Sequence, residues 1–451
     1  MRIPVIDDLK PNNKKLKQEE TVIRPYKMTD GGSDTIHHPE DIGVQHLPVD
    51  SHAPHTTAKH SRSVYKDPMI EADERTGNLF DYVNWRGDIP MSVDPFNEVD
   101  NLLLSALVYA PFDGLVPEKG SITLYALNIA FWNKYTVNDF HSFNPALRYS
   151  PLLLKRISVS RRFGNIRACS FINEFGTEDP YQVAAVTFLL EDGTCYVAFR
   201  GTDDSVHGWR EDMNLCYMAK THGQQLAVDY LNDRFRDTVQ FIRVGGHSKG
   251  GNLAEYAGMH CLPEVRERIR EIYSNDGPGF NKMITNSEEY RRIVPKVIKF
   301  MPEGSIVGIL LNSSAKAEVV KSTLSGVMQH SPYTWVIRRN VMVRANKRTD
   351  MSIFIDKTID DWVNSLDPDN SRIFIDILFD AIDVSGCATI GEFTDDPVRA
   401  YKAFYKTMRV LPPDKRATLL LVLQKLAASG TNQILSGLTN YLSTLSRNTD
   451  V

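Results

Sequence analysis

Apolar residues are concentrated in three short stretches between residues 165 and 199. These are 165–174 (NIRACSFINE), 181–190 (YQVAAVTFLL) and 194–199 (TCYVAF), separated by GTEDP and by EDG. Short apolar runs that are bounded by turn residues are typical of β-strands, and connections this short join antiparallel neighbours. The pattern therefore predicts an antiparallel meander of three strands.

Further along the chain, helical and extended patterns alternate. We expect helices at about 224–241, 249–261, 264–271 and 286–293, and strands at 242–245, 271–274 and 296–301. Upstream of the meander, 97–109 predicts a helix, and 120–162 is irregular and helical. Alternation of strands and helices produces parallel strands with helices on both faces. The sequence therefore predicts an α/β fold with a mixed, mostly parallel sheet.

The two ends of the chain differ from this central part. Residues 1–75 are polar, show no sustained period and hold half of the twelve histidines, so we expect a disordered tail. Because those histidines are irregularly spaced, a plain polar tail is favoured over a metal-binding tract. Residues 351–451 have helical patterns. We expect three parts: the tail 1–75, the α/β domain 76–350, and a helical region 351–451 that packs on the domain or caps it.

The composition excludes several classes of partner and site. Of 451 residues, 42% are hydrophobic and 24% charged, and the net charge is −4, so no bulk positive field favours nucleic acid. The five cysteines lack C-x-x-C spacing, which argues against a disulfide framework or a cysteine-based zinc site. We predict no cofactor. The chain starts without an apolar signal segment and has no run approaching the ~18 apolar residues of a membrane span. We therefore expect a cytoplasmic protein, with peripheral membrane contact left open.

Residues 246–250 (GHSKG) fit G-x-S-x-G between a predicted strand and a predicted helix. This context is that of a nucleophile elbow, a strained turn that exposes a serine hydroxyl above the sheet. The residues two before and two after the serine crowd each other, so glycine is required there. Gly251 and Ala254 would let the following helix pack closely on the strands. The pattern predicts that Ser248 is a nucleophile.

A nucleophilic serine needs a base, usually a histidine that a carboxylate orients. Two histidines follow Ser248. His260 lies on the helix after the elbow and should point away, whereas His330 follows the last predicted strand of the sheet, so we assign His330 as the base. Asp276 and Glu303 each follow a predicted strand at the edge where catalytic groups belong. We favour Asp276 as the acid and keep Glu303 as the alternative.

Thr202, through its hydroxyl and its backbone N–H, and Lys249, through its backbone N–H, are candidates for an oxyanion hole. Lys249 follows the nucleophile and opens the next helix, where N–H groups lack intrahelical partners and lie at the positive end of the helix dipole. Thr202 lies in YVAFRGTD (196–203), where a predicted strand ends. We therefore expect the oxyanion hole to consist of Thr202 and Lys249. The side chain of Lys249 is expected to be solvated.

These residues also carry a resemblance to a known family. AFRGTDDSVHGWREDMN (198–214) and GHSKGG (246–251) resemble the motifs of the class 3 lipase-like α/β-hydrolases. A bacterial branch of that superfamily is more closely similar, on WRGD…DPFNEVDNLLLS (85–105) and QHSPYTW (329–335). The resemblance covers about residues 79–440. It implies an α/β-hydrolase fold with a catalytic triad, and its residue assignments are nucleophile Ser248, base His330, oxyanion donors Thr202 and Lys249, and structural Trp209 and Asp212.

The chain departs from the family pattern at the acid. In class 3 lipases an aspartate follows the later strand, and here that position falls on Gly304 or Ser305. Asp276 or Glu303 would have to supply the carboxylate. The residues and the resemblance together indicate a serine esterase that acts on carboxylic esters. An acyltransferase, a thioesterase or a non-catalytic scaffold stays open, and the sequence sets neither the acyl chain, the leaving group nor the oligomeric state.

Overall fold

The computed structural model describes residues 76–143, 148–176, 181–202, 210, 214–215, 218, 220–365, 368–387, 397–422, 424 and 428. The chain divides into two units, Met1–Glu71 and Ala72–Val451, and the described residues all belong to the second. The expected polar tail lies outside the described residues. Within them, no helix is long and apolar enough to cross a membrane.

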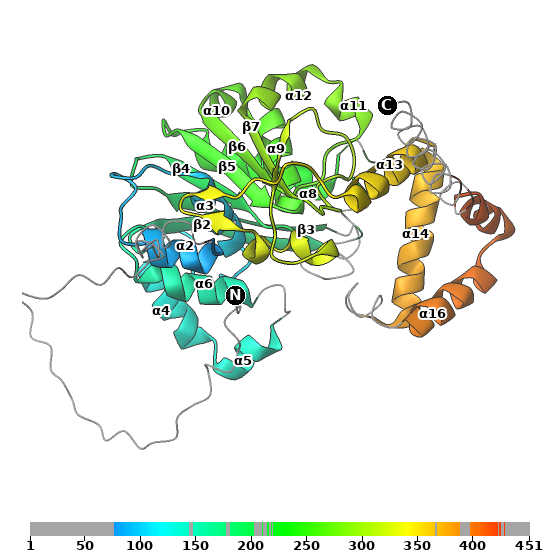
Figure 1. The fold of residues 1–451 in the computed structure, drawn as a ribbon, viewed down its shortest axis with the longest axis horizontal. Helices are drawn as coiled ribbons and strands as arrows, with labels where there is room; N and C mark the ends of the chain where they lie inside the picture. The colour runs from blue at the N-terminus through cyan, green and yellow to red at the C-terminus, as the bar shows by residue number, and fades with distance from the viewer. Residues whose placement is uncertain are drawn as a thin grey trace, which may run out of the picture. The chain divides into compact units, whose positions relative to one another are not determined.

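An eight-stranded sheet forms the centre of the second unit (Figure 1). Its strands neighbour one another in chain order, antiparallel from β1 to β4 and parallel from β4 to β8. The predicted meander and the predicted parallel half are both confirmed. The strands are β1 Ile122–Thr123, β2 Arg167–Gly176, β3 Tyr181–Leu189, β4 Cys195–Phe199, β5 Ile242–His247, β6 Ile269–Asn275, β7 Val297–Pro302 and β8 Ala317–Val320.

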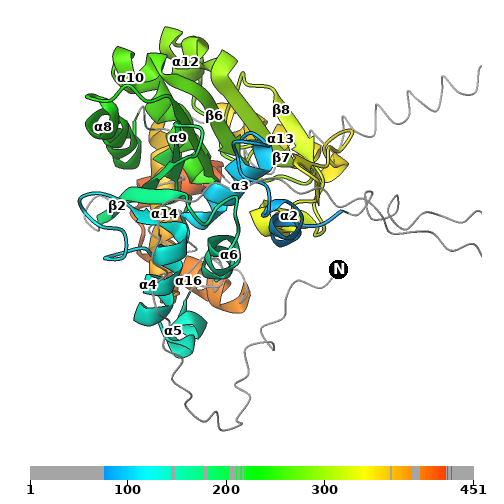
Figure 2. The ribbon, with the colours of Figure 1, turned by 90° about the vertical axis from the view of Figure 1, so that its left-hand side faces the viewer.

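Helices cover both faces of this sheet (Figure 2). One face packs on α2 Leu79–Arg86, α3 Glu98–Leu107, α4 Leu124–Lys134 and α6 Tyr149–Ser158. The other packs on α8 His222–Phe235, α9 Lys249–His260, α10 Pro263–Glu267 and α12 Glu288–Ile293. Further helices among the described residues are α5 Val137–Ser142, α11 Lys282–Thr285, α13 Asp350–Ser365, α14 Pro368–Ser385 and α16 Pro397–Val410, and residues 413–422 are also helical. The expected layers are therefore present.

Strand β4 shows why the sheet needs both layers. Its alternate side chains divide between the two cores: Tyr196 and Ala198 pack with α3, and Val197 and Phe199 pack with α8 and α9. Side chains of a strand alternate between faces, so a strand that is apolar at every position must be covered twice. The continuous run that predicted β4 is the signature of this double burial.

Several predicted boundaries were wrong. The helix expected over 224–241 ends at Phe235, and the apolar residues that extended its pattern, Val239 and Phe241, are exposed. The expected helix 264–271 ends at Glu267 because the chain enters β6 two residues later. The edge strands β1 and β8 were not predicted. They have two and four residues, too few for a pattern of period two.

A buried ion pair fixes α3 beneath the sheet. Arg162 and Asp100 have fully buried side chains, and Arg162 Nε donates to Asp100 Oδ1 over 2.9 Å. Arg162 Nη1 also donates to the Asp94 carbonyl (2.8 Å), and the Tyr82 hydroxyl donates to Asp100 Oδ1 (2.8 Å). Asn97 caps α3 in a reciprocal capping box with Asp100. These contacts join α2, the turn before α3 and the segment before β2.

We predict that Asp100→Ala lowers the free energy of unfolding by about 3–5 kcal/mol, because it leaves the Arg162 charge buried without a partner. Glu288→Ala is the matched control. Its partner Arg292 forms an exposed ion pair across one helical turn, and such a pair is worth at most about 0.5 kcal/mol. Urea unfolding followed by tryptophan fluorescence measures both. Equal losses in the two variants would contradict the account.

Candidate active site

Ser248 lies at a sharp turn between β5 and α9. Its backbone has φ 59° and ψ −134°, outside the regions that a serine ordinarily adopts, so the turn is strained. A Cβ at Gly246 would overlap the main-chain carbonyl of Gly250, and a Cβ at Gly250 would overlap the carbonyl oxygen of Phe199. The predicted reason for the two glycines is therefore confirmed, because main-chain atoms of Gly250 and Phe199 occupy the space that a side chain at either position would need.

Asn275, the last residue of β6, supports the turn from below. Its carbonyl oxygen accepts a hydrogen bond from the Ser248 N–H (2.9 Å), and its Nδ2 donates to the Gly246 carbonyl (3.1 Å). Its amide oxygen accepts from Asn101 Nδ2 of α3 over 2.9 Å. All these groups are buried, where a hydrogen bond is costly to break. Sequence analysis missed Asn275, since nothing local distinguishes it from other residues before a loop.

His330 and Asp276 form a short hydrogen bond. The distance from His330 Nδ1 to Asp276 Oδ2 is 2.6 Å, with the aspartate side chain fully buried and the histidine side chain 24% exposed. A carboxylate can only accept, so Nδ1 carries the proton. In the neutral ring the opposite nitrogen, Nε2, then has a lone pair. This is the protonation pattern of a general base.

The Asp276 carboxylate has two further donors. Ser305 Oγ donates to its Oδ1 over 2.5 Å, and the Gly308 N–H donates to the same oxygen over 3.2 Å. Asp276 has φ 51°, a left-handed conformation that aspartate tolerates better than most residues. This conformation lets the chain turn away directly after β6. Of Gly304 and Ser305, the two residues on which the class 3 resemblance would place an acid, Ser305 donates its hydroxyl hydrogen to the Asp276 carboxylate.

Glu303, the alternative acid, occupies a different place. It follows β7 and is partly buried. Its main chain is paired on both sides, with the N–H donating to the Val320 carbonyl (2.9 Å) and the carbonyl accepting from the Thr349 N–H (2.7 Å). Of the two candidate carboxylates, the structure brings that of Asp276 into a hydrogen bond with His330.

The expected oxyanion loop approaches the serine. A Cβ at Gly201 would lie 2.8 Å from Ser248 Cβ, so the backbone just before Thr202 lies against the nucleophile. Lys249 is the first residue of α9. Its side chain was expected to be solvated, and this was wrong: it is 1% exposed, because α9 is buried from Lys249 to Met259. Trp209 and Asp212 lie outside the described residues.

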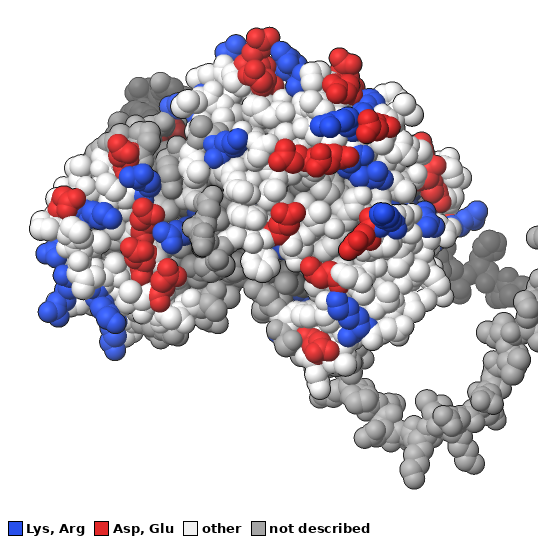
Figure 3. All heavy atoms as spheres, turned by 180° about the vertical axis from the view of Figure 1, so that it is seen from behind, with Lys and Arg blue, Asp and Glu red and all other residues white. Residues whose placement is uncertain are grey.

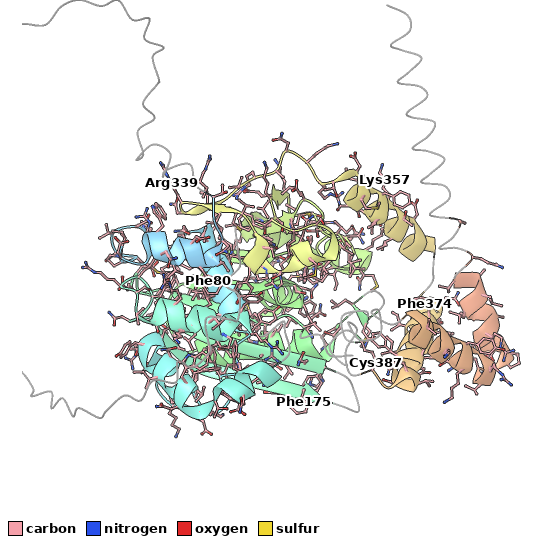
Figure 4. The ribbon with its side chains drawn as sticks, turned by 60° about the horizontal axis from the view of Figure 1, so that its bottom comes forward. Phe80, Phe175, Arg339, Lys357, Phe374 and Cys387 are labelled. Atoms are coloured by element: carbon pink, nitrogen blue, oxygen red, sulfur yellow. The ribbon has the colours of Figure 1, made fainter. Side chains whose placement is uncertain are left out.

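The segment that carries His330 is held by its neighbours. It comprises two short 3-10 turns, Gly326–His330 and Pro332–Thr334. Trp335 Nε1 donates to the Gln329 carbonyl (2.9 Å), and the Gly304 N–H donates to the Gln329 side chain (3.0 Å). Phe80 of α2, labelled in Figure 4, stacks on Tyr333 with ring centroids 6.0 Å apart. His260, which was expected to point elsewhere, is exposed at the end of α9 and contacts Tyr256.

The candidate site has no metal-binding cluster in the described part of the chain, where no group of three or more His, Cys, Asp or Glu side chains could hold an ion. The cysteines at 169, 195, 261 and 387 are buried and free of disulfides. His247, which precedes Ser248, has a ring whose centroid lies 4.5 Å from that of His330. Burial, and then the nearby His330, hold the pKa of His247 well below its usual value.

Sheet, elbow and histidine together define the class of fold. The serine follows β5 and opens α9, the aspartate follows the neighbouring parallel strand β6, and the histidine follows β8. This order of Ser, Asp and His at the carboxyl edge of a mostly parallel sheet is that of an α/β-hydrolase. The chain has the α/β-hydrolase fold.

The chain is similar to one known sequence family and to several solved structures. Residues 157–380, just under half of the chain, match the sequence model of a family described as Mbeg1-like. No curated protein sequence matches the chain. Three similar solved structures are M37 lipase, a fungal lipase–inhibitor complex and Lip2 lipase from Yarrowia lipolytica, at 13%, 13% and 14% identity. The alignments cover 48%, 55% and 42% of this chain and 71%, 81% and 78% of the others, with TM-scores of 0.30, 0.30 and 0.24.

We predict that Gly250→Ala costs about 1–3 kcal/mol of unfolding free energy, or more, because the new methyl group overlaps backbone that cannot move aside. Gly258→Ala is the matched control on the same helix. There the methyl group would meet the flexible end of Ile272, 2.6 Å away, and alanine has the better helix propensity by about 1 kcal/mol. Urea unfolding compares the two. A smaller loss for Gly250→Ala than for Gly258→Ala would contradict the account of the turn.

Proposed function

We propose that this protein is a serine hydrolase of carboxylic esters, lipase-like or esterase-like, in which Ser248, His330 and Asp276 form a catalytic triad. The observation that carries the proposal is the 2.6 Å hydrogen bond between His330 and the buried Asp276 beside the strained Ser248 turn. A serine hydroxyl is a weak nucleophile without such a base. A strained serine near an oriented histidine does not stabilise the fold in any evident way. The arrangement therefore favours a catalytic role over a structural one.

In the first half of the proposed reaction, Ser248 Oγ attacks the carbonyl carbon of the ester. His330 Nε2 takes the hydroxyl proton as the C–O bond forms, and the carbonyl oxygen becomes an oxyanion. The buried carboxylate of Asp276 stabilises the imidazolium that results. The tetrahedral intermediate then breaks its bond to the leaving oxygen, which receives the proton from His330. An alcohol leaves, and the acyl group stays on Ser248.

In the second half, water replaces the alcohol. His330 Nε2 takes a proton from water, and the resulting hydroxide equivalent attacks the acyl carbon. The second tetrahedral intermediate then breaks its bond to Ser248 Oγ, which receives that proton from His330, and the carboxylic acid is released. The backbone N–H groups of Thr202 and Lys249 are the proposed oxyanion donors in both halves. Each such donor typically contributes about 10²–10³-fold to kcat.

The substrate is proposed to be a small-molecule or lipid acyl ester. The face of the molecule in Figure 3 has basic and acidic side chains interspersed over it, and on that face no basic tract suits a nucleic-acid backbone. Residence in the cytoplasm, membership of a bacterial branch, and a C-terminal region from 351 that packs on or caps the domain remain predictions. Peripheral contact with a membrane is compatible with this substrate class.

Two other functions use the same fold. An acyltransferase or a thioesterase would employ the same three residues, and would differ in the acceptor or in the leaving sulfur. A non-catalytic scaffold would use the fold alone as a binding surface. The short His330–Asp276 bond favours the catalytic alternatives, because a scaffold has no need of an oriented base.

We predict that a fluorophosphonate probe labels the wild-type protein on the peptide that contains Ser248, and that Ser248→Ala abolishes labelling. The probe reacts only with a serine that a base activates. Ser121→Ala, which removes a hydroxyl near the start of β1, is the control and should label fully. Mass spectrometry of the digest locates the label. An unlabelled but folded wild-type protein would reject the proposed function in favour of the scaffold.

Exchange of the two candidate acids should separate their roles. Asp276→Asn should lower kcat for a p-nitrophenyl ester by about 10⁴-fold, because the amide no longer fixes the His330 tautomer or stabilises the imidazolium. Glu303→Gln should stay near the wild-type rate. The comparison is made at a single pH with each variant's unfolding midpoint checked. If Glu303→Gln were the more damaged variant, the assignment of the acid would be wrong.

A further inference from the structure

A second histidine lies between the nucleophile and the base. His247 immediately precedes Ser248 and is 4% exposed. Its ring lies against that of His330, with centroids 4.5 Å apart, and its Nε2 is 2.7 Å from the main-chain oxygen of His330. On the opposite side, its Nδ1 is 3.0 Å from the Tyr109 hydroxyl. His247 thus connects Tyr109, just beyond the end of α3, to the segment that carries the base.

The partners of His247 settle its tautomer. A carbonyl oxygen can only accept, so Nε2 carries the proton and donates it to His330 O. In the neutral ring Nδ1 is then an acceptor, and the Tyr109 hydroxyl donates to it. Burial and the neighbouring His330 hold the pKa of His247 well below its usual value, so the ring stays neutral near pH 7. Because Nε2 is committed to that carbonyl, His247 is unsuited to act as a second base.

We propose that His247, oriented by Tyr109, is a positioning residue that holds the main chain of His330 in register with Ser248. This inference rests on the proposed function of Ser248 and His330. The imidazole of His330 is oriented by Asp276, but that hydrogen bond fixes only the ring. The bond from His247 fixes the backbone from which the ring projects. Nucleophile and base are thereby connected through adjacent residues of one turn.

Tyr109 extends the same connection to the oxyanion loop. It is buried just beyond the C-terminal end of α3, and its ring meets the His247 ring edge-on with centroids 5.9 Å apart. A Cβ at Gly201 would overlap the Tyr109 hydroxyl, so this hydroxyl lies directly against the loop that precedes Thr202. The pair of Tyr109 and His247 therefore contacts the nucleophile turn, the base segment and the oxyanion loop.

The test uses the full-length protein and two substitutions of the same histidine. His247→Phe keeps a ring of similar size but loses both nitrogens. His247→Gln keeps an amide N–H that can reach the His330 carbonyl. Tyr109→Phe removes the orienting hydroxyl, and Tyr230→Phe is its matched control, a buried tyrosine whose hydroxyl bonds to Thr187 and to the Ser170 carbonyl.

We expect His247→Phe to lower kcat for a p-nitrophenyl ester by about 10–10²-fold with little change in KM, because a displaced base slows chemistry rather than binding. His247→Gln should recover most of kcat. The kcat of Tyr109→Phe should lie between those of the two His247 variants, and the kcat of Tyr230→Phe should equal that of the wild type. In the same samples, hydrogen exchange of peptide 326–335 should accelerate in His247→Phe and return toward wild type in His247→Gln.

The tests of the positioning role and of the proposed function can give negative results independently of each other. Equal losses of kcat in the Phe and Gln variants, or unchanged exchange of peptide 326–335 in His247→Phe, would overturn the positioning role. If the wild-type protein neither labels at Ser248 nor hydrolyses esters, the proposed function fails. The exchange comparison then still decides whether His247 fixes the His330 segment. A variant with a collapsed unfolding midpoint is replaced by Tyr109→Phe, whose exchange must then accelerate relative to Tyr230→Phe.

Discussion

The site depends on one steric constraint, the close passage of backbone at Gly246 and Gly250 around Ser248. Side chains at these two positions would overlap main-chain atoms of the same turn and of β4. With both absent, β5 runs directly into α9, and Ser248 takes a backbone conformation that costs of order 1–3 kcal/mol. The surrounding hydrogen bonds through Asn275 hold it there.

The electrostatics of the site follow from this turn. Because β5 and β6 are parallel neighbours, the residues after them emerge at the same edge, and Asp276 reaches the histidine that follows β8. Ser305, which follows β7, donates its hydroxyl hydrogen to the Asp276 carboxylate from the neighbouring strand end. Three donors, from His330, Ser305 and Gly308, converge on the fully buried carboxylate of Asp276 and fix its orientation.

Sequence analysis located the parts of the site that depend on local chemistry. The elbow was predictable because its two glycines are required by steric crowding within a stretch of five residues. His330 was predictable because only two histidines follow Ser248 in the sequence. The sequence favoured Asp276 over Glu303 but did not show which of the two carboxylates bonds to His330. Both follow parallel strands, and the deciding facts are the left-handed φ of Asp276 and the hydroxyl of Ser305.

Residues whose roles come from distant partners were missed or misjudged. His247 contacts Tyr109, just beyond the end of α3, and Asn275 contacts Asn101 of α3, and both partners lie far away in the sequence. Lys249 was expected in solvent because lysine usually is, yet α9 is covered along nearly its whole length. The same applies to strand β8, whose four residues pair with β7 and, at Val320, with Arg344. Tertiary context decided each of these.

The central claim is that Ser248 becomes acylated during turnover. The most direct test is to mix the protein with a p-nitrophenyl ester whose acyl group is hydrolysed slowly from the enzyme, and to quench the reaction in acid within the first turnover. Mass spectrometry then gives the mass of the peptide that contains Ser248. The account predicts a mass increase equal to one acyl group on Ser248, appearing together with a burst of p-nitrophenol. Ester turnover without that adduct, or with the acyl group on another residue, would contradict it.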